Sequence, residues 1–296
     1  MNIDFENFTE MLLKLLKEKL GEEYQIYITK VRKNNGILLT GLVIKKEKSS
    51  VFPTVYIDSF FHEEISRKEV EQTAELLYQR FQAADLKETV DLSNFLEFET
   101  AKENLSFKLI NRERNKELLK LVPHRQIHDL AIVYYYTVQE APFFGKAVIL
   151  IYNSHLEYWK IEQEKLHETA FFNAPHLFPA QIEDIESLVR EFMMEKDEAQ
   201  RLPMYVLTNR QKLQGAACML YPEILKDFGN KTQQNFFVLP SSVHEVILVP
   251  DTGYMSQEAL RDIVTDINRT QVAEEEILAD SVYYFSRQRQ RLEWLC

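Results

Sequence analysis

The sequence predicts an α+β protein with mixed, mainly antiparallel sheets and flanking helices, arranged in two or three small packed units. Apolar residues make up 45% of the 296 residues and charged residues 27%, which are values of a folded globular chain. The expected elements run helix, sheet, helix, then sheet and two helices, then strand, helix, sheet and helix. A chain of this length suits about two domains of about 100–200 residues each.

The first region, residues 1–115, is expected to form an N-terminal α+β unit. One apolar stripe at helical spacing predicts an opening helix that ends near Gly21, and it consists of Phe5, Phe8, Leu12, Leu15, Leu16 and Leu20. Two apolar runs flank Asn35-Gly36, and this arrangement is typical of a β-hairpin. A third strand near residues 51–58 and a helix over 62–84 complete this unit.

The second region, residues 116–200, is expected to combine a sheet with two helices. The runs 130–139 and 145–153 predict two strands, and helices are predicted over 156–173 and 181–199. Pro175 and Pro179 are expected to end the first of these helices.

The third region, residues 201–296, is expected to be a C-terminal α+β unit that could share one domain with the second region. Its predicted elements are a strand over 204–209, a helix broken near Pro222, strands on both sides of residues 240–242, a helix capped by Ser256 and a helical tail over 273–296.

Composition narrows the range of partners and locations. A net charge of −11 opposes binding to nucleic acid and to anionic membranes, so neither partner is expected. The two cysteines, Cys218 and Cys296, are too few for a disulfide framework, and no apolar run is long enough to cross a bilayer. A cytoplasmic location is therefore expected.

The common cofactor motifs are missing from the sequence. It contains no G-x-G-x-x-G, no G-x-x-x-x-G-K-[ST], no H-E-x-x-H and no G-x-S-x-G, and only seven glycines. Loops that cradle phosphates need glycine because the backbone must approach the ligand closely. We therefore expect no cofactor.

The segment Ser241-Ser242-Val243-His244-Glu245 is the strongest candidate for chemistry. Hydroxyl, imidazole and carboxylate groups lie within five residues of one another, and nucleophilic catalysis needs these three types. In a strand, however, Ser242 and His244 share one face while Glu245 points to the other, so a local triad is not expected. The alternative roles are turn hydrogen bonds for the serines and a structural hydrogen bond for His244.

Other residues are weaker candidates for a site. Asn209, at the end of the predicted strand 204–209, and Asn173 are candidate binding residues, although Asn173 is also expected to cap the end of its helix. His124 and His128 would share one face of a helix and could bind a metal, as could Asp58. Helix capping and packing are the favoured roles for all three, so no metal site is predicted.

Four segments resemble one family in the same order along the chain. They are residues 109–136, residues 149–175, MYVLTNRQKLQGAACMLYPEIL and NFFVLPSSVHEVILVP. They are similar to the uncharacterised bacterial proteins grouped as domain of unknown function 5688. The resemblance implies a bacterial protein with a mobile-element or phage setting, and it carries over no functional residue.

Taken together, the sequence favours a non-enzymatic protein-interaction or ligand-binding module. A protein partner or self-association is favoured over a small molecule, because aromatic runs such as Tyr134–Tyr136 and Tyr283–Phe285 can anchor interfaces. The alternative is a hydrolase-like enzyme that uses Ser241 or Ser242 with His244 and an acid from elsewhere in the fold. An enzyme predicts a carboxylate within reach of His244.

Overall fold

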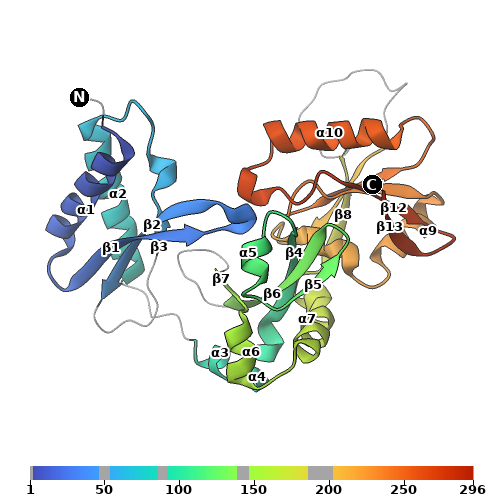
Figure 1. The fold of residues 1–296 in the computed structure, drawn as a ribbon, viewed down its shortest axis with the longest axis horizontal. Helices are drawn as coiled ribbons and strands as arrows, with labels where there is room; N and C mark the ends of the chain where they lie inside the picture. Colours follow the sequence, from blue (N-terminus) through green and yellow to red (C-terminus); the bar gives the residue numbers. More distant parts are fainter. Residues whose placement is uncertain (1–2, 47–53, 86–91, 139–146, 186–202, 296) are drawn as a thin grey trace. The chain divides into compact units, whose positions relative to one another are not determined.

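The computed structural model describes residues 3–46, 54–85, 92–138, 147–185 and 203–295. The chain divides into two compact units (Figure 1). The first unit consists of residues 1–33, 37–92 and 139–147, and the second of residues 34–36, 93–138 and 148–296. Helices and several antiparallel sheets occur together, so the predicted α+β class is confirmed.

The first unit is an antiparallel three-stranded sheet with two helices. Its elements are α1 (Phe5–Leu20), β1 (Tyr24–Arg32), β2 (Leu38–Lys46), β3 (Thr54–Tyr56), the 3₁₀ helix η2 (Asp58–Phe60) and α2 (Arg67–Asp85). The sheet has the order β1-β2-β3, so the predicted hairpin at Asn35-Gly36 is confirmed. The apolar stripe of α1 is buried against α2 and the sheet.

Local capping decides where the helices of this unit begin. The Asp4 carboxylate accepts a hydrogen bond from the backbone N–H of Asn7 and so starts α1. Ser66 and Glu69 form a reciprocal pair: Glu69 N–H donates to the Ser66 hydroxyl, and Ser66 N–H donates to the Glu69 carboxylate. This pair starts α2 at Arg67 rather than at His62, where the sequence placed it.

A four-stranded sheet forms one layer of the second unit. It contains β4 (Leu105–Asn111), β5 (His124–Ile127), β6 (Leu130–Val138) and β7 (Ala147–Leu150). Short helices border it: α3 (Ser93–Leu96), α4 (Phe98–Ala101), η3 (Lys102–Asn104), α5 (Lys116–Leu119) and α6 (Asn153–Trp159). The longer α7 (Gln163–Leu177) packs on β4, where the Phe107 and Phe171 rings stack with their centroids 4.0 Å apart.

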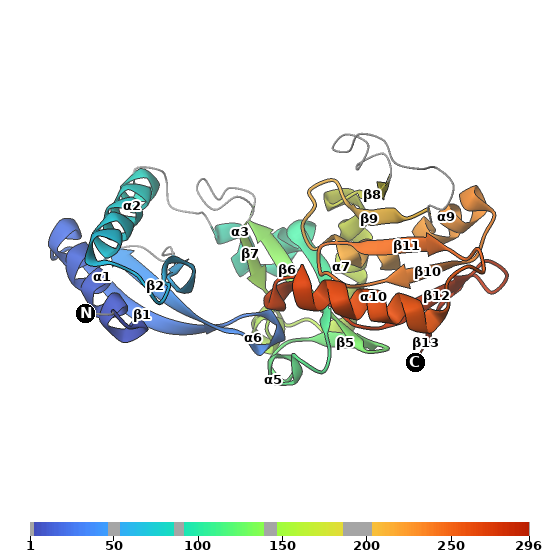
Figure 2. The ribbon, with the colours of Figure 1, turned by 90° about the horizontal axis from the view of Figure 1, so that it is seen from above.

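A six-stranded antiparallel sheet forms the other layer, in the order β13-β12-β10-β11-β9-β8. Its strands are β8 (Ala180–Asp184), β9 (Tyr205–Asn209), β10 (Phe236–Leu239), β11 (Val246–Pro250), β12 (Val282–Ser286) and β13 (Arg291–Leu295). The 3₁₀ helix η5 (Gly215–Leu220) and α9 (Ile224–Thr232) follow β9. Helix α10 (Gln257–Thr270) lies along this sheet (Figure 2), and Ser256 caps it as predicted.

Several helices predicted from the sequence are wrong. Residues 180–184 form the edge strand β8, although a helix was expected from Gln181, and the rest of that helix falls largely outside the described residues. The helix expected over 156–173 is two helices, because Lys160 adopts a left-handed conformation between them. Pro175 lies inside α7 and does not end it. The tail expected to be helical contains the β12–β13 hairpin, and its run Val282–Phe285 consists of residues that favour strands.

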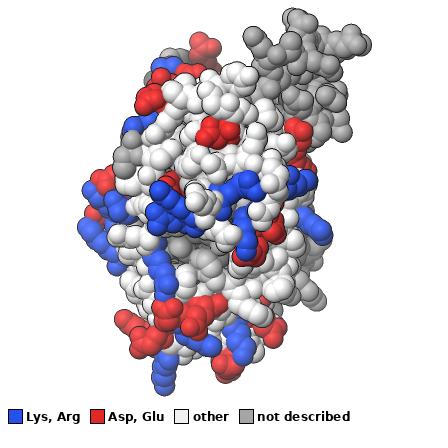
Figure 3. Space-filling view, turned by 90° about the vertical axis from the view of Figure 1, so that its right-hand side faces the viewer, with Lys and Arg blue, Asp and Glu red and all other residues white. Residues whose placement is uncertain are grey.

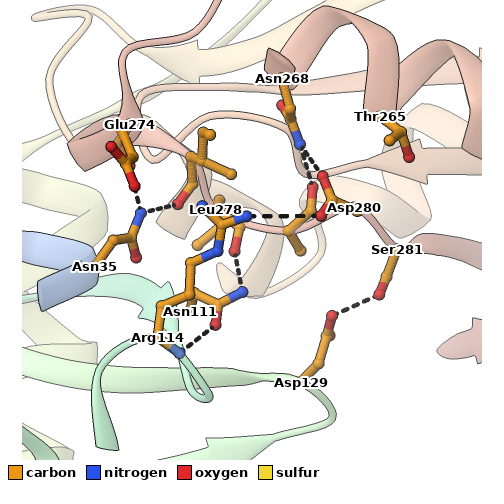
Figure 4. A network of polar contacts seen from close by, with 12 residues as sticks. Asn35, Asn111, Arg114, Asp129, Thr265, Asn268, Glu274, Leu278, Asp280 and Ser281 are labelled. Carbon is orange, nitrogen blue, oxygen red and sulfur yellow. Dashed lines mark hydrogen bonds and ion pairs between the residues drawn. The ribbon is translucent and has the colours of Figure 1, made fainter. Parts of the chain in front are cut away.

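The segment 274–281, which includes η6 (Glu274–Glu276), is held by asparagine side chains (Figure 4). The Asn34 side-chain amide donates to the carbonyl of Glu275, and that of Asn35 donates to the carbonyls of Glu274 and Ile277. Asn111 donates to Leu278, and Asn268 donates to Ala279. Residues 34–36 and this segment belong to the second unit. These amides satisfy carbonyl groups that have no helix or sheet partner of their own.

Candidate functional site

The connection between β10 and β11 lies against the connection between β9 and η5. Strands β9 and β11 pair in antiparallel orientation, so the segment that follows β9 lies next to the segment that precedes β11. The Thr208 hydroxyl donates to the carbonyl of His244 at 2.7 Å, and the N–H of Ala216 donates to the carbonyl of Val243 at 3.2 Å. The two segments most specific for the resemblance therefore meet at one place.

A third segment completes this place. Ser242 forms an isolated antiparallel bridge with Ile277. The N–H of Val243 donates to the carbonyl of Glu276 at 2.8 Å, and the N–H of Leu278 donates to the carbonyl of Ser241 at 2.8 Å. The asparagine contacts fix the same segment from its other side. The result is that Glu276 lies beside His244, although 32 residues separate them in sequence.

Both ring nitrogens of His244 have partners. The backbone N–H of Gln214 lies 3.3 Å from Nδ1, and a Glu276 carboxylate oxygen lies 3.3 Å from Nε2. A backbone N–H can only donate, so Nδ1 accepts and the ring proton sits on Nε2, where it faces the carboxylate. The His244 side chain is 21% exposed, and the Glu276 side chain is 44% exposed. This arrangement holds the ring in one orientation.

Ser242 is buried, with an exposed fraction of 4%. Its hydroxyl oxygen accepts a hydrogen bond from the backbone N–H of His244 at 3.0 Å. This contact is a local turn bond, of the kind that serine makes two residues ahead of an N–H. Ser241 is half-buried, and its carbonyl is used in the bridge to Leu278.

Asn209 shapes the loop that approaches His244. Its side-chain oxygen accepts from the N–H groups of Gln211 at 3.1 Å and Leu213 at 3.3 Å, and its amide donates to the Leu213 carbonyl at 2.7 Å. Asn209 is 2% exposed. Lys212 and Gln214 in this loop have φ values of 52° and 55°, which non-glycine residues adopt at a cost. Asn209 is thus the residue that folds the loop.

Gly215 allows the two connections to touch. A Cβ at this position would lie 2.2 Å from the Thr208 hydroxyl and 2.5 Å from the carbonyl oxygen of His244. Two acceptors nearby in sequence, the side-chain oxygens of Gln211 and Gln214, are buried and make no hydrogen bond within the described residues. Strain and unsatisfied polar groups concentrated in one loop are features of functional sites.

Asn173 lies elsewhere and does not cap α7. It sits within the helix, and its side-chain amide donates to the carbonyls of Lys102 at 2.6 Å and Leu105 at 3.2 Å. The expected cap is therefore wrong, and Asn173 joins α7 to the start of β4. Trp159 at the end of α6 is anchored through its indole N–H, which donates to the Phe95 carbonyl at 3.0 Å.

Each of the three weak metal candidates has its own surroundings in the structure. His124 lies on β5 with Nδ1 3.0 Å from the Val122 carbonyl, and His128 follows that strand in a left-handed conformation, so the expected helical pair is wrong. Asp58 belongs to the first unit and accepts from the N–H and hydroxyl of Thr40. Across the described ranges, no three His, Cys, Asp or Glu side chains cluster in a way that could hold a metal.

Sequence reasoning missed Glu276 and Gln214 as neighbours of His244. Glu276 stands in the acidic run Glu274–Glu276, and such a run is typical of a solvated surface. No local pattern connects it to His244, because the contact depends on the bridge between residues 242 and 277.

Fold and site together define an α+β protein of two compact units, with a polar candidate site where three chain segments meet. The chain belongs to a family of unknown function (DUF5688), whose model matches residues 5–287. No curated protein and no solved structure is detectably similar to it. None of the helices in the described ranges has the length and apolar character needed to span a membrane.

Proposed function

We propose that the protein is a non-enzymatic interaction module that binds another protein or a second copy of itself. The observation that carries this proposal is that the polar side chains of the candidate site already form hydrogen bonds within the protein. The ring nitrogens of His244 face Gln214 and Glu276, and the Ser242 hydroxyl is buried and accepts from the His244 backbone. A general base needs a nitrogen within reach of the proton that it removes.

Exposed aromatic side chains support the same proposal. Tyr254 is 89% exposed, Phe172 is 72% exposed and Tyr158 is 65% exposed, and they lie in the second unit on the connection before α10, on α7 and on α6. Large aromatic side chains supply much of the binding energy at protein interfaces. Interaction through such residues requires no free nucleophile.

The alternative is a hydrolase-like enzyme that uses Ser241 or Ser242 with His244. The position of Glu276 favours it, because a carboxylate does lie within reach of the imidazole. In this alternative Nε2 faces the acid, so Nδ1 would act as the base. Nδ1 would first have to release the N–H of Gln214.

A fluorophosphonate probe separates the two functions, because it labels serines that are activated as nucleophiles. We expect no labelling of the folded protein at neutral pH. Labelling that disappears in Ser242→Ala but persists in Ser256→Ala, a helix-cap serine outside the site, would overturn the proposal. Cross-linking in a host lysate followed by mass spectrometry is expected to recover a stoichiometric protein partner or a dimer.

A bacterial cytosolic setting with a mobile-element or phage association belongs to the same proposal. The resemblance in the four segments supports the bacterial setting, and the buried free thiol of Cys218 is compatible with a reducing compartment. Identification of the neighbouring genes tests the mobile-element association.

A further inference from the structure

Strand β13 is an edge of the six-stranded sheet. It pairs with β12 on one side, from Val282 opposite Leu295 to Ser286 opposite Arg291. Among the residues that the structure describes, no strand pairs with its other side. An unpaired edge offers a row of backbone donors and acceptors to another extended chain.

The β12–β13 hairpin concentrates positive charge in an acidic protein. Arg287, Arg289 and Arg291 alternate with glutamines, while the whole chain carries a net charge of −11. Figure 3 looks onto the side of the second unit that carries this hairpin and α9, and Lys and Arg side chains gather across its middle. An acidic partner would be attracted to this face and repelled by much of the remaining surface.

Glu293 on the hairpin neutralises only part of the positive charge of its arginines. Glu293 accepts from Arg289 Nη1 at 2.8 Å and from Arg291 Nε at 3.0 Å, so two guanidinium groups share one carboxylate. Their side chains remain 61% and 66% exposed. Each guanidinium has further donors, and these can bind a second carboxylate in a bidentate manner.

Hydrogen bonds from Arg287 to Gln233 also hold the hairpin in place. Arg287 donates from Nη1 to the Gln233 carbonyl and from Nη2 to the Gln233 side-chain oxygen, both at 2.9 Å. Its Cγ passes 3.1 Å from the position of a Cβ at Gly229, so the absence of a side chain there gives it room against α9. A preordered edge loses less conformational entropy when a partner binds.

An indole lies next to this edge. Trp294 is 39% exposed, and its ring lies 5.9 Å from that of His128. Charged side chains on an edge strand can simply prevent unwanted pairing, but that role gives no reason to expose an indole. An exposed Trp is instead typical of interface anchors, and this one lies on the same strand as Arg291, with its side chain on the opposite face of the sheet.

We propose that the outer edge of β13, with Arg289 and Arg291, binds an extended acidic segment of a partner protein as an additional strand. Backbone hydrogen bonds would provide the pairing, and the two arginines would select for glutamate or aspartate side chains. This inference rests on the proposed interaction function and names its surface and the chemistry of its partner.

The test uses the full chain and a fluorescein-labelled peptide of alternating glutamate and valine, measured by fluorescence anisotropy. We expect saturable binding, and a loss of affinity of at least about tenfold in the double variant Arg289→Gln/Arg291→Gln. The matched control is Arg269→Gln, a 77% exposed arginine on α10, which should bind as the wild type does. The same peptide with methylated backbone nitrogens should not bind.

Three results would overturn the inference. They are unchanged affinity in the double variant, equal binding of the methylated peptide, and tighter binding of single-stranded DNA than of the peptide. The lysate experiment distinguishes failure of the proposed interaction function from failure of the inference about the β13 surface. If the double variant still captures the wild-type partner, the interaction function stands and the β13 surface is wrong.

Discussion

Replacement of Gly215 by alanine tests the close approach that builds the candidate site. The added Cβ would lie 2.2 Å from the Thr208 hydroxyl, 2.5 Å from the carbonyl oxygen of His244 and 2.8 Å from the backbone nitrogen of Asn209. Two of these three atoms belong to the backbone, so rotation of a side chain cannot relieve the contact. The Thr208 hydroxyl also loses its 2.7 Å hydrogen bond to His244 if it moves.

We expect Gly215→Ala to lower the free energy of unfolding of the second unit by about 3 kcal/mol, the upper part of the range for overpacked cores. Both tryptophans, Trp159 and Trp294, belong to that unit. Their emission during urea unfolding therefore reports on it without interference from tryptophan in the first unit.

The matched control is Gly229→Ala. Its Cβ would lie 3.1 Å from Arg287 Cγ and 3.3 Å from the Phe236 ring, both side-chain contacts that are looser than those at Gly215, and alanine gains about 1 kcal/mol of helix propensity over glycine. We expect the stability of this variant to stay within about 1 kcal/mol of the wild type. Equal stability of Gly215→Ala and the wild type would refute the packing of η5 against residue 244.

Three further outcomes are expected. Asn268→Ala, which removes the buried amide that donates to Ala279 and Asp280, should cost about 2 kcal/mol by urea titration, whereas Asp262→Ala, at an exposed position of the same helix, should cost less than about 1 kcal/mol. Burial lowers the pKa of His167, so the folded state favours the neutral imidazole. The stability that this provides is present above about pH 6.5 and is lost as the pH falls below that value. The free energy of unfolding of His167→Gln should therefore change less over the same pH range. Burial raises the pKa of the Cys218 thiol to about 12, so a Cys296→Ser variant should react with a disulfide reagent at pH 8 only after unfolding.

Much of the fold follows from local signals in the sequence. The stripe from Phe8 to Leu20 is buried along α1, and Ser256 accepts from the N–H of Ala259 to start α10. The Asn35-Gly36 turn joins two antiparallel strands, with Asn35 at a φ of 58°. Each of these features depends on residues within a few positions of one another, so periodicity and capping rules are sufficient to find them.

Other elements could not be predicted, because their partners are distant in sequence. Residues 180–184 open the segment for which a helix was expected from Gln181, yet they pair with β9 from Ala180 opposite Asn209 to Asp184 opposite Tyr205. The tail beyond residue 281 opens with the β-forming run Val282–Phe285, but the strand that β12 pairs with, β10, is distant in sequence, and β13 pairs with β12. Hydrogen bonding within a sheet outweighs weak local preference for a helix.

The candidate site shows the same division. The sequence by itself marked Ser242 and His244 as candidates and excluded Glu245 on the expectation of a strand there, whereas β11 begins only at Val246. Only the tertiary structure brought Glu276 and the N–H of Gln214 to the two ring nitrogens. The reason is physical: the asparagine amides and the bridge at residue 242 position a segment whose own sequence carries no sign of its partner.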